Sequence, residues 1–319
     1  MVVLGVDVSK GDLHAVLLTD DRHSAKRSFP NREIGFEQLV KWLKNRGVDH
    51  VHACMEATGG WGDDLGAYLH DRGHVVSIVN PARIKAFGQS EGLRTKTDGV
   101  DAALIARFCR AHQPDPWTPP TPKERELQAL IRRREGLIEM RTQELNRSSA
   151  AHRTKAVGAS IDDHVAYLTA MIEGIEGDIR KLVDEDDNLR GKRDLLTSIP
   201  GIGEQTAHSI LGEIPNLAEF RDVKAVVAHA GLSPKHHQSG QSPGISRLCK
   251  AGNANLRKAL YFPALAAMKS NPAIRAFAGR LQARGKRKMV IVTAVMRKLL
   301  VIAYGVLKGG RAFTASPAS

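Results

Sequence analysis

Short apolar runs and helically spaced apolar positions alternate through the first 112 residues. An apolar run interrupted by one acid predicts a buried strand at the start, and two further strand patterns follow after turn-sized gaps, which predicts a three-stranded meander. The expected strands lie at residues 2–10, 12–19, 23–29, 49–55 and 74–79, and the expected helices at 34–47, 61–71, 81–87 and 98–110. The order β-β-β-α-β-α-β-α predicts an α/β domain over residues 1–112.

Four acids fall at particular places in this order. Asp7 lies within the first strand, Glu56 follows the fourth, and Asp98 and Asp101 open the last helix. The element order resembles that of the ribonuclease H-like fold, and the resemblance implies acids from these same elements. An acid within a run of valines costs several kcal/mol unless it is paired or coordinated. Asp98 and Asp101 share a helix face because they are three residues apart.

These acids predict a metal site for phosphoryl transfer. Oxygen-only ligands favour Mg²⁺, or Mn²⁺, over zinc. A pair of such ions activates a nucleophile and stabilises the leaving oxygen. Ordinary structural roles stay open: Asp98 as a helix cap, Asp101 as a partner of the helix dipole, Asp7 at a strand end and Glu56 as a solvated turn residue.

A proline-rich segment over residues 113–122 predicts the first domain boundary. Beyond it, residues 123–146 have a charged helical pattern, and apolar residues spaced in threes and fours over 162–190 predict a coiled-coil seam. We expect residues 123–190 to form an antiparallel coiled-coil arm that also dimerises. An ordinary helical bundle is the alternative. The polar residues 148–160 between the two helices predict an exposed basic tip.

The C-terminal part, residues 191–319, is expected to be mostly helical. In the segment 195–211, two helical patterns are joined by Pro200-Gly201-Ile202-Gly203, which resembles a helix-hairpin-helix motif; a plain glycine-rich connection is the alternative. In that motif the glycines let backbone N–H groups approach a DNA phosphate, a contact that does not read base sequence. Residues 232–244 predict a long polar loop with no element of its own, and such loops are often functional.

Charge is distributed unevenly along the chain. The net charge is +13, yet residues 1–222 carry 30 basic and 34 acidic residues, a net charge of −4, and residues 223–319 carry 17 Lys and Arg and no acid. This predicts a polyanionic partner, nucleic acid first, with a merely soluble basic surface as the alternative. The positions expected to contact nucleic acid are Arg94, Lys96, Arg153, Lys155, Gly201, Gly203, Lys235, Arg247, Lys250, Arg257, Lys286, Arg287 and Lys288.

The composition argues against a membrane or secreted protein. No run reaches the roughly 18 consecutive apolar residues of a membrane span, and the most apolar segment, 289–307, is interrupted by Arg297 and Lys298. The three cysteines lack metal-ligand spacing and are expected to be free thiols in a reducing compartment. Because no basic segment precedes an apolar one at the N-terminus, we expect no secretory signal and a cytoplasmic, nucleoid-associated protein.

Motifs in both halves closely resemble one family. In the C-terminal half they are Ala230-Gly231-Leu232-Ser233-Pro234, Gln238-Ser239-Gly240, Lys250-Ala251-Gly252-Asn253 and Leu256-Arg257-Lys258-Ala259-Leu260-Tyr261. In the N-terminal half they are Gly5-Val6-Asp7-Val8-Ser9-Lys10, Met55-Glu56-Ala57-Thr58-Gly59 and Lys96-Thr97-Asp98-Gly99-Val100-Asp101-Ala102. In this order, over almost the whole chain, they resemble the DEDD insertion-sequence transposases, also called bridge recombinases, which are related to the pilin-gene DNA invertases.

The resemblance implies a division of roles. Asp7, Glu56, Asp98 and Asp101 would be the metal-binding acids of a RuvC-like domain, and Ser239 would be the nucleophile that attacks a DNA phosphate to give a covalent phosphoserine. Family members excise and insert their element as DNA, and many are directed by a structured guide RNA. They work as dimers that assemble into tetramers, so acids of one subunit could serve the serine of another.

Ser233 and Ser242 are the alternative nucleophiles, and the Ser-Gly context favours Ser239. A serine hydroxyl needs activation, and residues 223–319 offer no carboxylate as a base. A metal ion held by the N-terminal acids would supply that activation.

The chain departs from the family pattern at Cys249, where Ser is common, and at Gly99 and Val100, where many members carry Ala-Arg. Neither departure touches an expected catalytic residue.

The sequence leaves four functions open. The first is an active transposase, and the second is a site-specific DNA invertase, which shares every motif above. The third is a Holliday-junction nuclease that uses the acids and water without the serine. The fourth is a nucleic-acid-binding protein with a vestigial site, and the presence of all four acids argues against it.

Overall fold

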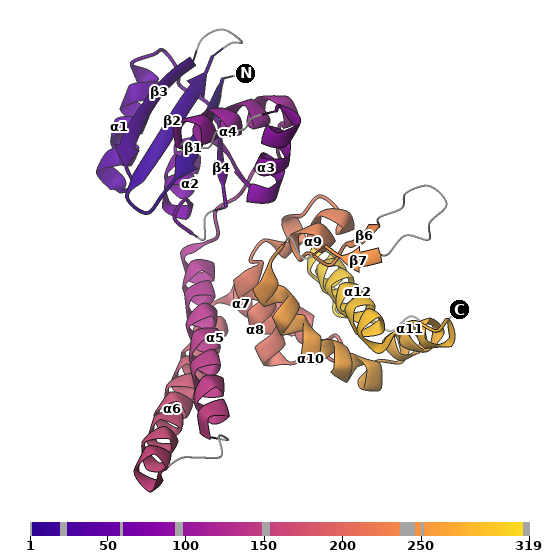
Figure 1. Ribbon diagram of the computed structural model, residues 1–319. Coiled ribbons are helices and arrows are strands. Elements are labelled where there is room, and N and C mark those ends of the chain that lie inside the picture. The colour runs from indigo at the N-terminus through magenta and orange to yellow at the C-terminus, as the bar shows by residue number, and fades with distance from the viewer. Residues whose placement is uncertain are drawn as a thin grey trace. The chain divides into compact units, whose positions relative to one another are not determined.

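The computed structural model describes residues 2–19, 24–57, 60–92, 98–148, 154–236, 246–249 and 252–314. The chain divides into two compact units, Met1–Pro119 and Pro120–Ser319 (Figure 1). The division falls within the proline-rich segment 113–122. The helices expected to form the arm belong to the second unit, so the separation of the arm from the C-terminal domain stays a prediction.

The first unit is built on a five-stranded mixed sheet. Its strands are β1 (Val3–Val8), β2 (Asp12–Leu18), β3 (Ser24–Pro30), β4 (His52–Glu56) and β5 (Val75–Val79). They lie in the order β3-β2-β1-β4-β5, with β1 antiparallel to β2 and parallel to β4. The meander and the strand–helix alternation after it follow the hydrophobic pattern, and the strand order is that of a ribonuclease H-like sheet.

Helices cover both faces of this sheet. They are α1 (Glu33–Lys44), α2 (Asp63–His70), α3 (Pro81–Ser90) and α4 (Asp98–His112). Leu4 and Val6 of β1 share a core with α1 and α2, whereas Val3 shares a core with α3 and α4. Successive side chains of a strand point to opposite faces. The odd-numbered residues of β1, Asp7 among them, therefore belong to the α4 face.

Gly5 allows α4 to lie directly on β1. A Cβ atom at this position would lie 2.3 Å from the carbonyl oxygen of Ala102 and 2.4 Å from the amide nitrogen of Ala106. Both atoms belong to the backbone of α4, so no side-chain rotation could make room. The missing side chain thus sets the distance between the strand that carries Asp7 and the helix that carries Asp101.

All three cysteines are free, as their spacing predicts. Cys54 and Cys109 are buried, and Cys249 is half-buried. The Cys109 Sγ lies 3.9 Å from the carbonyl oxygen of His52, to which it donates a hydrogen bond. The hydrogen bond with Cys109, followed by burial, raises the pKa of the Cys54 thiol, which therefore stays protonated.

The second unit is almost entirely helical, as expected. Its helices are α5 (Pro122–Ser148), α6 (Lys155–Glu185), α7 (Asp187–Thr197), α8 (Glu204–Glu213), the short 3₁₀ helix η1 (Leu217–Glu219), α9 (Val223–His229), α10 (Ala254–Ser270), α11 (Pro272–Ala283) and α12 (Lys288–Gly309). The strands β6 (Pro234–His236) and β7 (Ser246–Leu248) form a small antiparallel sheet. One hydrophobic core joins residues from α5 through α12.

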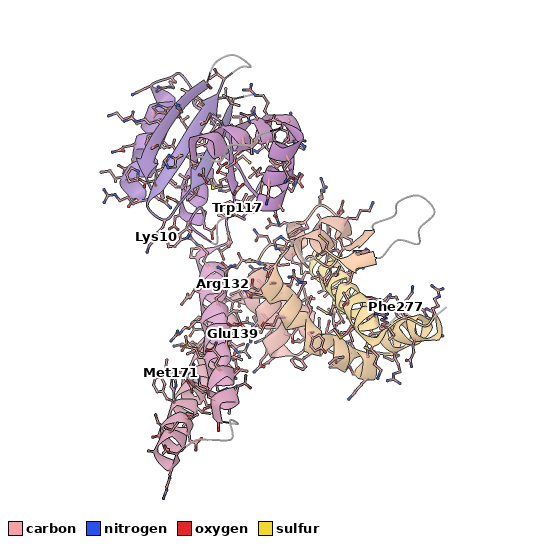
Figure 2. All side chains as sticks on the ribbon, viewed as in Figure 1. Lys10, Trp117, Arg132, Glu139, Met171 and Phe277 are labelled. Carbon is pink, nitrogen blue, oxygen red and sulfur yellow. The ribbon has the colours of Figure 1, made fainter. Side chains whose placement is uncertain are left out.

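The long helices α5 and α6 pack against each other as a pair. Figure 2 marks Glu139 on α5 and Met171 on α6. Leu137, Leu168 and Ile172 form a small hydrophobic core of their own between the two helices. A pair of helices is therefore present where the arm was expected, whereas its coiled-coil geometry and its dimerisation stay predictions.

Two expectations for this region are corrected. Residues 155–160, expected to lie between the two helices, form the first turns of α6, and most of them are exposed as expected. The pattern over 162–190 is also not one helix, because it breaks at Asp186. The Asp186 carboxylate accepts a hydrogen bond from the backbone N–H of Leu189 at 2.9 Å and so caps α7. A capping carboxylate satisfies a backbone N–H at a helix start and competes with continuation of the preceding helix.

Among the described residues, one helix, α12, is long and apolar enough to cross a membrane. Half of its most apolar window is buried within the protein. Val295, Leu299 and Ala303 are fully buried in the core of the second unit, and α12 packs against α9, α10 and α11. The apolar character of α12 is thus accounted for by its place in this core.

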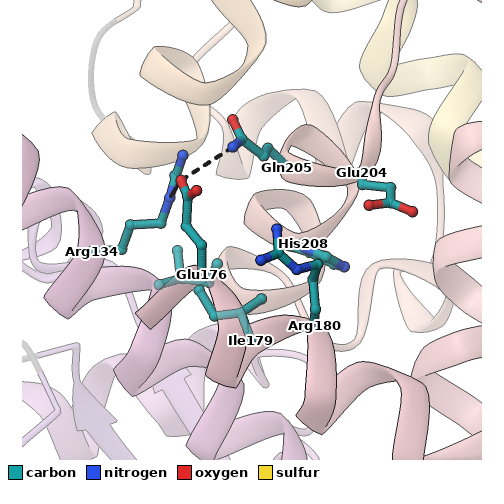
Figure 3. A pocket seen from close by; sticks show the side chains of 8 residues that line it. Arg134, Glu176, Ile179, Arg180, Glu204, Gln205 and His208 are labelled. Atoms are coloured by element: carbon teal, nitrogen blue, oxygen red, sulfur yellow. Dashed lines mark hydrogen bonds and ion pairs between the residues drawn. The ribbon is translucent and has the colours of Figure 1, made fainter. Parts of the chain in front are cut away.

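A buried histidine lies where α5, α6 and α8 meet. His208 of α8 is 4% exposed, and within the described part of the chain its Nε2 has no hydrogen-bond partner. Figure 3 shows it in a small pocket with Glu176, which accepts hydrogen bonds from Arg134 Nε at 2.7 Å and Gln205 Nε2 at 3.1 Å. The cavity of about 20 Å³ has room for about one water molecule.

Replacing His208 with Leu is expected to make the protein less sensitive to acid. Desolvation lowers the pKa of His208 from its usual 6.5, so the folded state holds it neutral while the unfolded chain takes up a proton. The free energy of unfolding therefore falls as the pH drops below about 6.5. The free energy of unfolding can be measured at several pH values by urea unfolding followed by far-UV circular dichroism. Below about pH 6.5 it should fall less steeply for His208→Leu than for the wild type. Equal slopes for His208→Leu and the wild type would contradict the prediction.

Candidate active site

Asp7 and Glu56 come together at the carboxyl ends of two neighbouring parallel strands. Val6 of β1 pairs in register with Met55 of β4, so Asp7 and Glu56 occupy the next pair of positions. Neighbouring strands lie about 4.8 Å apart, and residues at paired positions share a face. Both acids are half-buried, on the face that α4 covers. The sheet thus brings together two carboxylates that are far apart in the sequence.

Helix α4 carries the other two acids. Asp101 is half-buried and precedes Ala102, whose carbonyl lies against Gly5 of β1. Asp98 is the first residue of α4, and its side chain lies outside the described residues. The structure therefore brings Asp7, Glu56 and Asp101 to one face of the sheet.

The donor chemistry of these acids fits a hard divalent cation, because carboxylate oxygens are the ligands that Mg²⁺ and Mn²⁺ take in proteins. In the described ranges, no group of three or more His, Cys, Asp or Glu side chains is placed to hold a metal ion. Of the expected site, the structure shows the pairing of Asp7 with Glu56 at adjacent strand ends. The assignment of all four acids as ligands stays a prediction.

Sequence reasoning missed one neighbour of Asp7. His14 of β2 lies directly opposite Asp7 in the antiparallel register, so it shares the α4 face. Its Nδ1 lies 2.8 Å from the Oγ of Ser28 on β3. The alternation of β2 signals this position, because Leu13 and Ala15 on either side of it point into the opposite core. An imidazole beside a metal-site candidate can donate a hydrogen bond, accept one or bind a cation.

The expected nucleophile falls between two short strands that sequence analysis did not predict. β6 and β7 pair from Pro234 opposite Leu248 to His236 opposite Ser246. The expectation of no element within residues 232–244 is therefore wrong at its start. Three-residue strands are too short to show the alternation on which sequence prediction depends.

The residues between these strands, 237–245, lie outside the described residues, and they include both Ser239 and Ser242. At the base of the hairpin, the backbone N–H of Cys249 donates a hydrogen bond to the Ser233 carbonyl at 2.8 Å. Ser233, the other alternative, is half-buried there. The structure thus fixes the frame that carries Ser239 and leaves its role a prediction.

Arg257 ties this frame to the rest of the unit. Its Nη1 donates hydrogen bonds to the carbonyl oxygens of Ala230 and Gly252, both at 3.0 Å, and of Asn253 at 3.2 Å. These carbonyls flank the two ends of the hairpin, so the guanidinium holds the ends together. Arg257 therefore has a structural role, and its contact with nucleic acid stays a prediction.

Asn253 anchors the same segment from the other side. Its Oδ1 accepts a hydrogen bond from the backbone N–H of Leu256 at 3.0 Å and caps α10. Its Nδ2 donates to the buried carboxylate of Glu213 at 2.8 Å, and Asn255 Nδ2 donates to the same carboxylate at 3.2 Å. Buried carboxylates are costly without such donors. The Lys-Ala-Gly-Asn motif thus ends in a cap that is fixed to α8.

The remaining positions expected to bind nucleic acid divide into two groups. Lys155 at the start of α6, and Lys286, Arg287 and Lys288 before and at the start of α12, are exposed. Of the others, the structure gives no side-chain position for Arg94, Lys96, Arg153, Lys235, Arg247 and Lys250. Lys235 and Arg247 occupy paired positions of the β6–β7 register.

The connection between α7 and α8 has the glycines that the motif requires, but Gly201 also has a packing reason. Gly201 has φ +103°, and a Cβ there would lie 2.6 Å from the Cβ of Ala267 in α10. Gly203 is the N-cap residue of α8 and has open space around it. Gly203 is therefore the better placed of the two to admit a phosphate, while phosphate binding at this turn stays a prediction.

Comparison with known families gives two matches. Residues 4–152 match a family described as "Transposase", and residues 193–279 match the "Transposase IS116/IS110/IS902 family". Together they span the strands that carry Asp7 and Glu56 and the hairpin that frames residue 239. A solved structure of Thermus thermophilus RuvC in complex with a Holliday junction substrate covers 37% of this chain and all of that one, at a TM-score of 0.28 and 16% identity. That likeness is too slight to support a conclusion.

Full-length relatives agree with the family matches. The pilin gene-inverting protein of Moraxella lacunata is 34% identical over 314 residues, which cover 97% of this chain and 97% of that protein. The transposase for insertion sequence element IS1328 of Yersinia enterocolitica is 23% identical over 351 residues, which cover 98% of this chain and 99% of that protein. The chain therefore belongs to the IS116/IS110/IS902 family of transposases.

Proposed function

We propose that this transposase excises and inserts a DNA element by strand exchange through a covalent phosphoserine. The observation that carries the proposal is the pairing of Asp7 with Glu56 at adjacent strand ends, in a chain of a transposase family. Two carboxylates at that spacing suit the metal-assisted chemistry of phosphodiesters.

Asp7, Glu56, Asp98 and Asp101 would hold Mg²⁺, or Mn²⁺ in its place. When bound, such an ion neutralises phosphate charge and lowers the pKa of a nearby hydroxyl. His14, opposite Asp7 in the strand register, would orient that carboxylate. Loss of a residue that orients a metal ligand typically costs about 10- to 100-fold in metal affinity or activity.

Ser239 is the proposed nucleophile. Its Oγ forms a bond to the phosphorus of a DNA phosphodiester while one P–O ester bond of the strand breaks, and the leaving oxygen takes up a proton. The hydroxyl proton of the serine leaves to a base, and no carboxylate of residues 223–319 can take it because that segment carries no Asp or Glu. Attack on the phosphoserine by the hydroxyl end of another strand reverses the step and completes the exchange.

The partners we propose are the DNA of the element ends and of the target, together with a structured guide RNA. The 17 basic residues and the absence of acids over residues 223–319 support polyanion binding. The exposed cluster Lys286–Lys288 supports it at one place on the surface. We also propose that the paired helices α5 and α6 mediate a dimer that assembles into a tetramer.

A site-specific invertase is the second candidate function. It uses the same residues and the same strand exchange, and the identity with the pilin gene-inverting protein favours it. The DNA that flanks the gene separates the two: insertion-element ends favour the transposase, and inverted recombination sites around a reversible segment favour the invertase.

The serine mechanism is tested by trapping the adduct. The full-length protein, with its co-purifying RNA, is incubated with element-end DNA and Mg²⁺ and then denatured. We expect a covalent protein–DNA adduct from the wild type and from Ser242→Ala, and none from Ser239→Ala. Cleavage by Ser239→Ala at the wild-type rate would instead support a nuclease that uses water. DNA retention without any Mg²⁺-dependent cleavage would support a binding protein.

A further inference from the structure

A second cavity, in the first unit, lies beside the loops that follow the two acid-bearing strands. It measures about 420 Å³, within the range of small-ligand sites. Its lining includes Lys10 from the loop after β1, Trp61 from the loop after β4, and Arg32 and Phe36 from the start of α1. In Figure 2, Lys10 projects from the end of the sheet away from the N-terminus.

Asn31 fixes the two loops to each other. Its Nδ2 donates one hydrogen bond to the carbonyl oxygen of Ser9 at 2.8 Å and another to the carbonyl oxygen of Trp61 at 3.0 Å. Its own backbone N–H donates to the carbonyl of Gly11 at 2.8 Å. Both donor hydrogens of the side-chain amide are thereby used. The walls of the cavity that carry Lys10 and Trp61 are therefore tied together.

The cavity presents an aromatic face beside a cation. Trp61 is 49% exposed, and the Nζ of Lys10 lies 5.9 Å from the centroid of its ring. The rings of Phe36 and Tyr68 lie 5.5 Å apart and form another part of the wall. An exposed indole next to ammonium and guanidinium groups is the combination that binds single-stranded nucleic acid, because bases stack on the ring and phosphates meet the cations.

We propose that this cavity binds an unpaired nucleotide, whose base stacks on Trp61 while Lys10 and Arg32 contact its phosphates. Glu33 and Asp64 also line the cavity and offer acceptors to the exocyclic amino group of a base. Each lies in the first turn of a helix, where the helix dipole offsets its charge.

The inference rests on the proposed function, since strand exchange leaves nucleotides unpaired near the bond that breaks. Lys10 is three residues beyond Asp7, and Trp61 is five residues beyond Glu56. The cavity is therefore close in the chain to both strand ends that carry the acids. The lining from α1 and α2 belongs to the face of the sheet opposite to α4. A nucleotide held there would help to keep the strand open near the ends of the two strands that carry the acids.

The test measures binding without chemistry. The full-length protein is titrated, in EDTA, with fluorescent oligodeoxycytidine of about 12 nucleotides, and with the RNA of the same sequence. We expect Trp61→Ala to weaken binding of one or both probes by about 5- to 150-fold, the effect of one lost stacking partner. Trp61→Phe should retain most of the affinity. Phe262→Ala, which removes a ring that is 75% exposed on α10, should bind as the wild type does.

Comparing the affinities for the DNA probe and the RNA probe shows whether the unpaired nucleotide belongs to DNA or to RNA. Equal affinities of Trp61→Ala and the wild type for both probes would overturn the inference, as would a loss shared by Phe262→Ala. If Trp61→Ala binds the probes more weakly and Ser239→Ala still forms the covalent adduct, the cavity is a nucleotide site and Ser239 is not the nucleophile. The two proposals can therefore fail independently.

Discussion

Asp7→Asn is expected to reduce strand exchange by about 10³-fold, because a metal-site carboxylate contributes several kcal/mol to the stabilisation of transition-state charge. The amide has the shape of the carboxylate but lacks its negative charge. Asp7 lies at the end of a buried strand, paired with Glu56 on one side and opposite His14 on the other. Removing its charge therefore alters the middle of the candidate site without changing the length of any side chain.

The control for this variant is Asp12→Asn, at an exposed position at the start of β2. Both variants should have the same denaturant midpoint of unfolding as the wild type. Only Asp7→Asn should fail to form the covalent adduct. Raising the Mn²⁺ concentration is expected to recover part of the lost rate if the charge acts through a bound cation. If Asp7→Asn exchanged strands at the wild-type rate, Asp7 would not be part of the active site.

Gly5→Ala is expected to lower the free energy of unfolding of the first unit by at least about 1–3 kcal/mol, the usual cost of overpacking a core. The new methyl group would lie 2.3 Å from the Ala102 carbonyl oxygen and 2.4 Å from the Ala106 amide nitrogen. Relief requires α4 to move away from β1, which also displaces Asp101. The rate of strand exchange should therefore fall by more than the decrease in the fraction of folded protein explains.

Tryptophan fluorescence measures this effect in the first unit alone. All three tryptophans, Trp42, Trp61 and Trp117, lie within Met1–Pro119. Gly11→Ala is the matched control, because Gly11 is exposed and a Cβ there would meet nothing within 4 Å. If urea midpoints of the two variants coincide, α4 does not depend on the missing side chain at Gly5.

The pairing of Asp7 with Glu56 could be expected from the sequence. Each lies near the end of a segment with a strong strand pattern, and the two strands are parallel neighbours in the sheet. Register then follows from the alternation of buried residues, since a slip by one position would send every side chain to the other face. The position of α4 was also predictable, and Gly5 gives its reason. Asp98 was predicted on the same basis, and only its backbone is described.

Other features were not predictable because they depend on contacts between distant segments. The strands β6 and β7 are too short for a pattern, and the hydrogen bonds of Arg257 to three carbonyl oxygens join segments that are distant in the sequence. The apolar pattern over residues 162–190 has one break, at Asp186, but it resumes at Leu189 and does not show that a local cap ends the helix there. The tie made by Asn31 between two loops is visible only once the sheet has brought them together.

The clamped hairpin limits how far the proposed nucleophile can travel. Strand β6 ends at His236, three residues before Ser239. A fully extended chain advances at most about 3.5 Å per residue, so the serine backbone stays within about 10 Å of the strand end in any conformation. For Ser239 to act as proposed, the scissile phosphate would therefore have to come within this short radius of the end of β6.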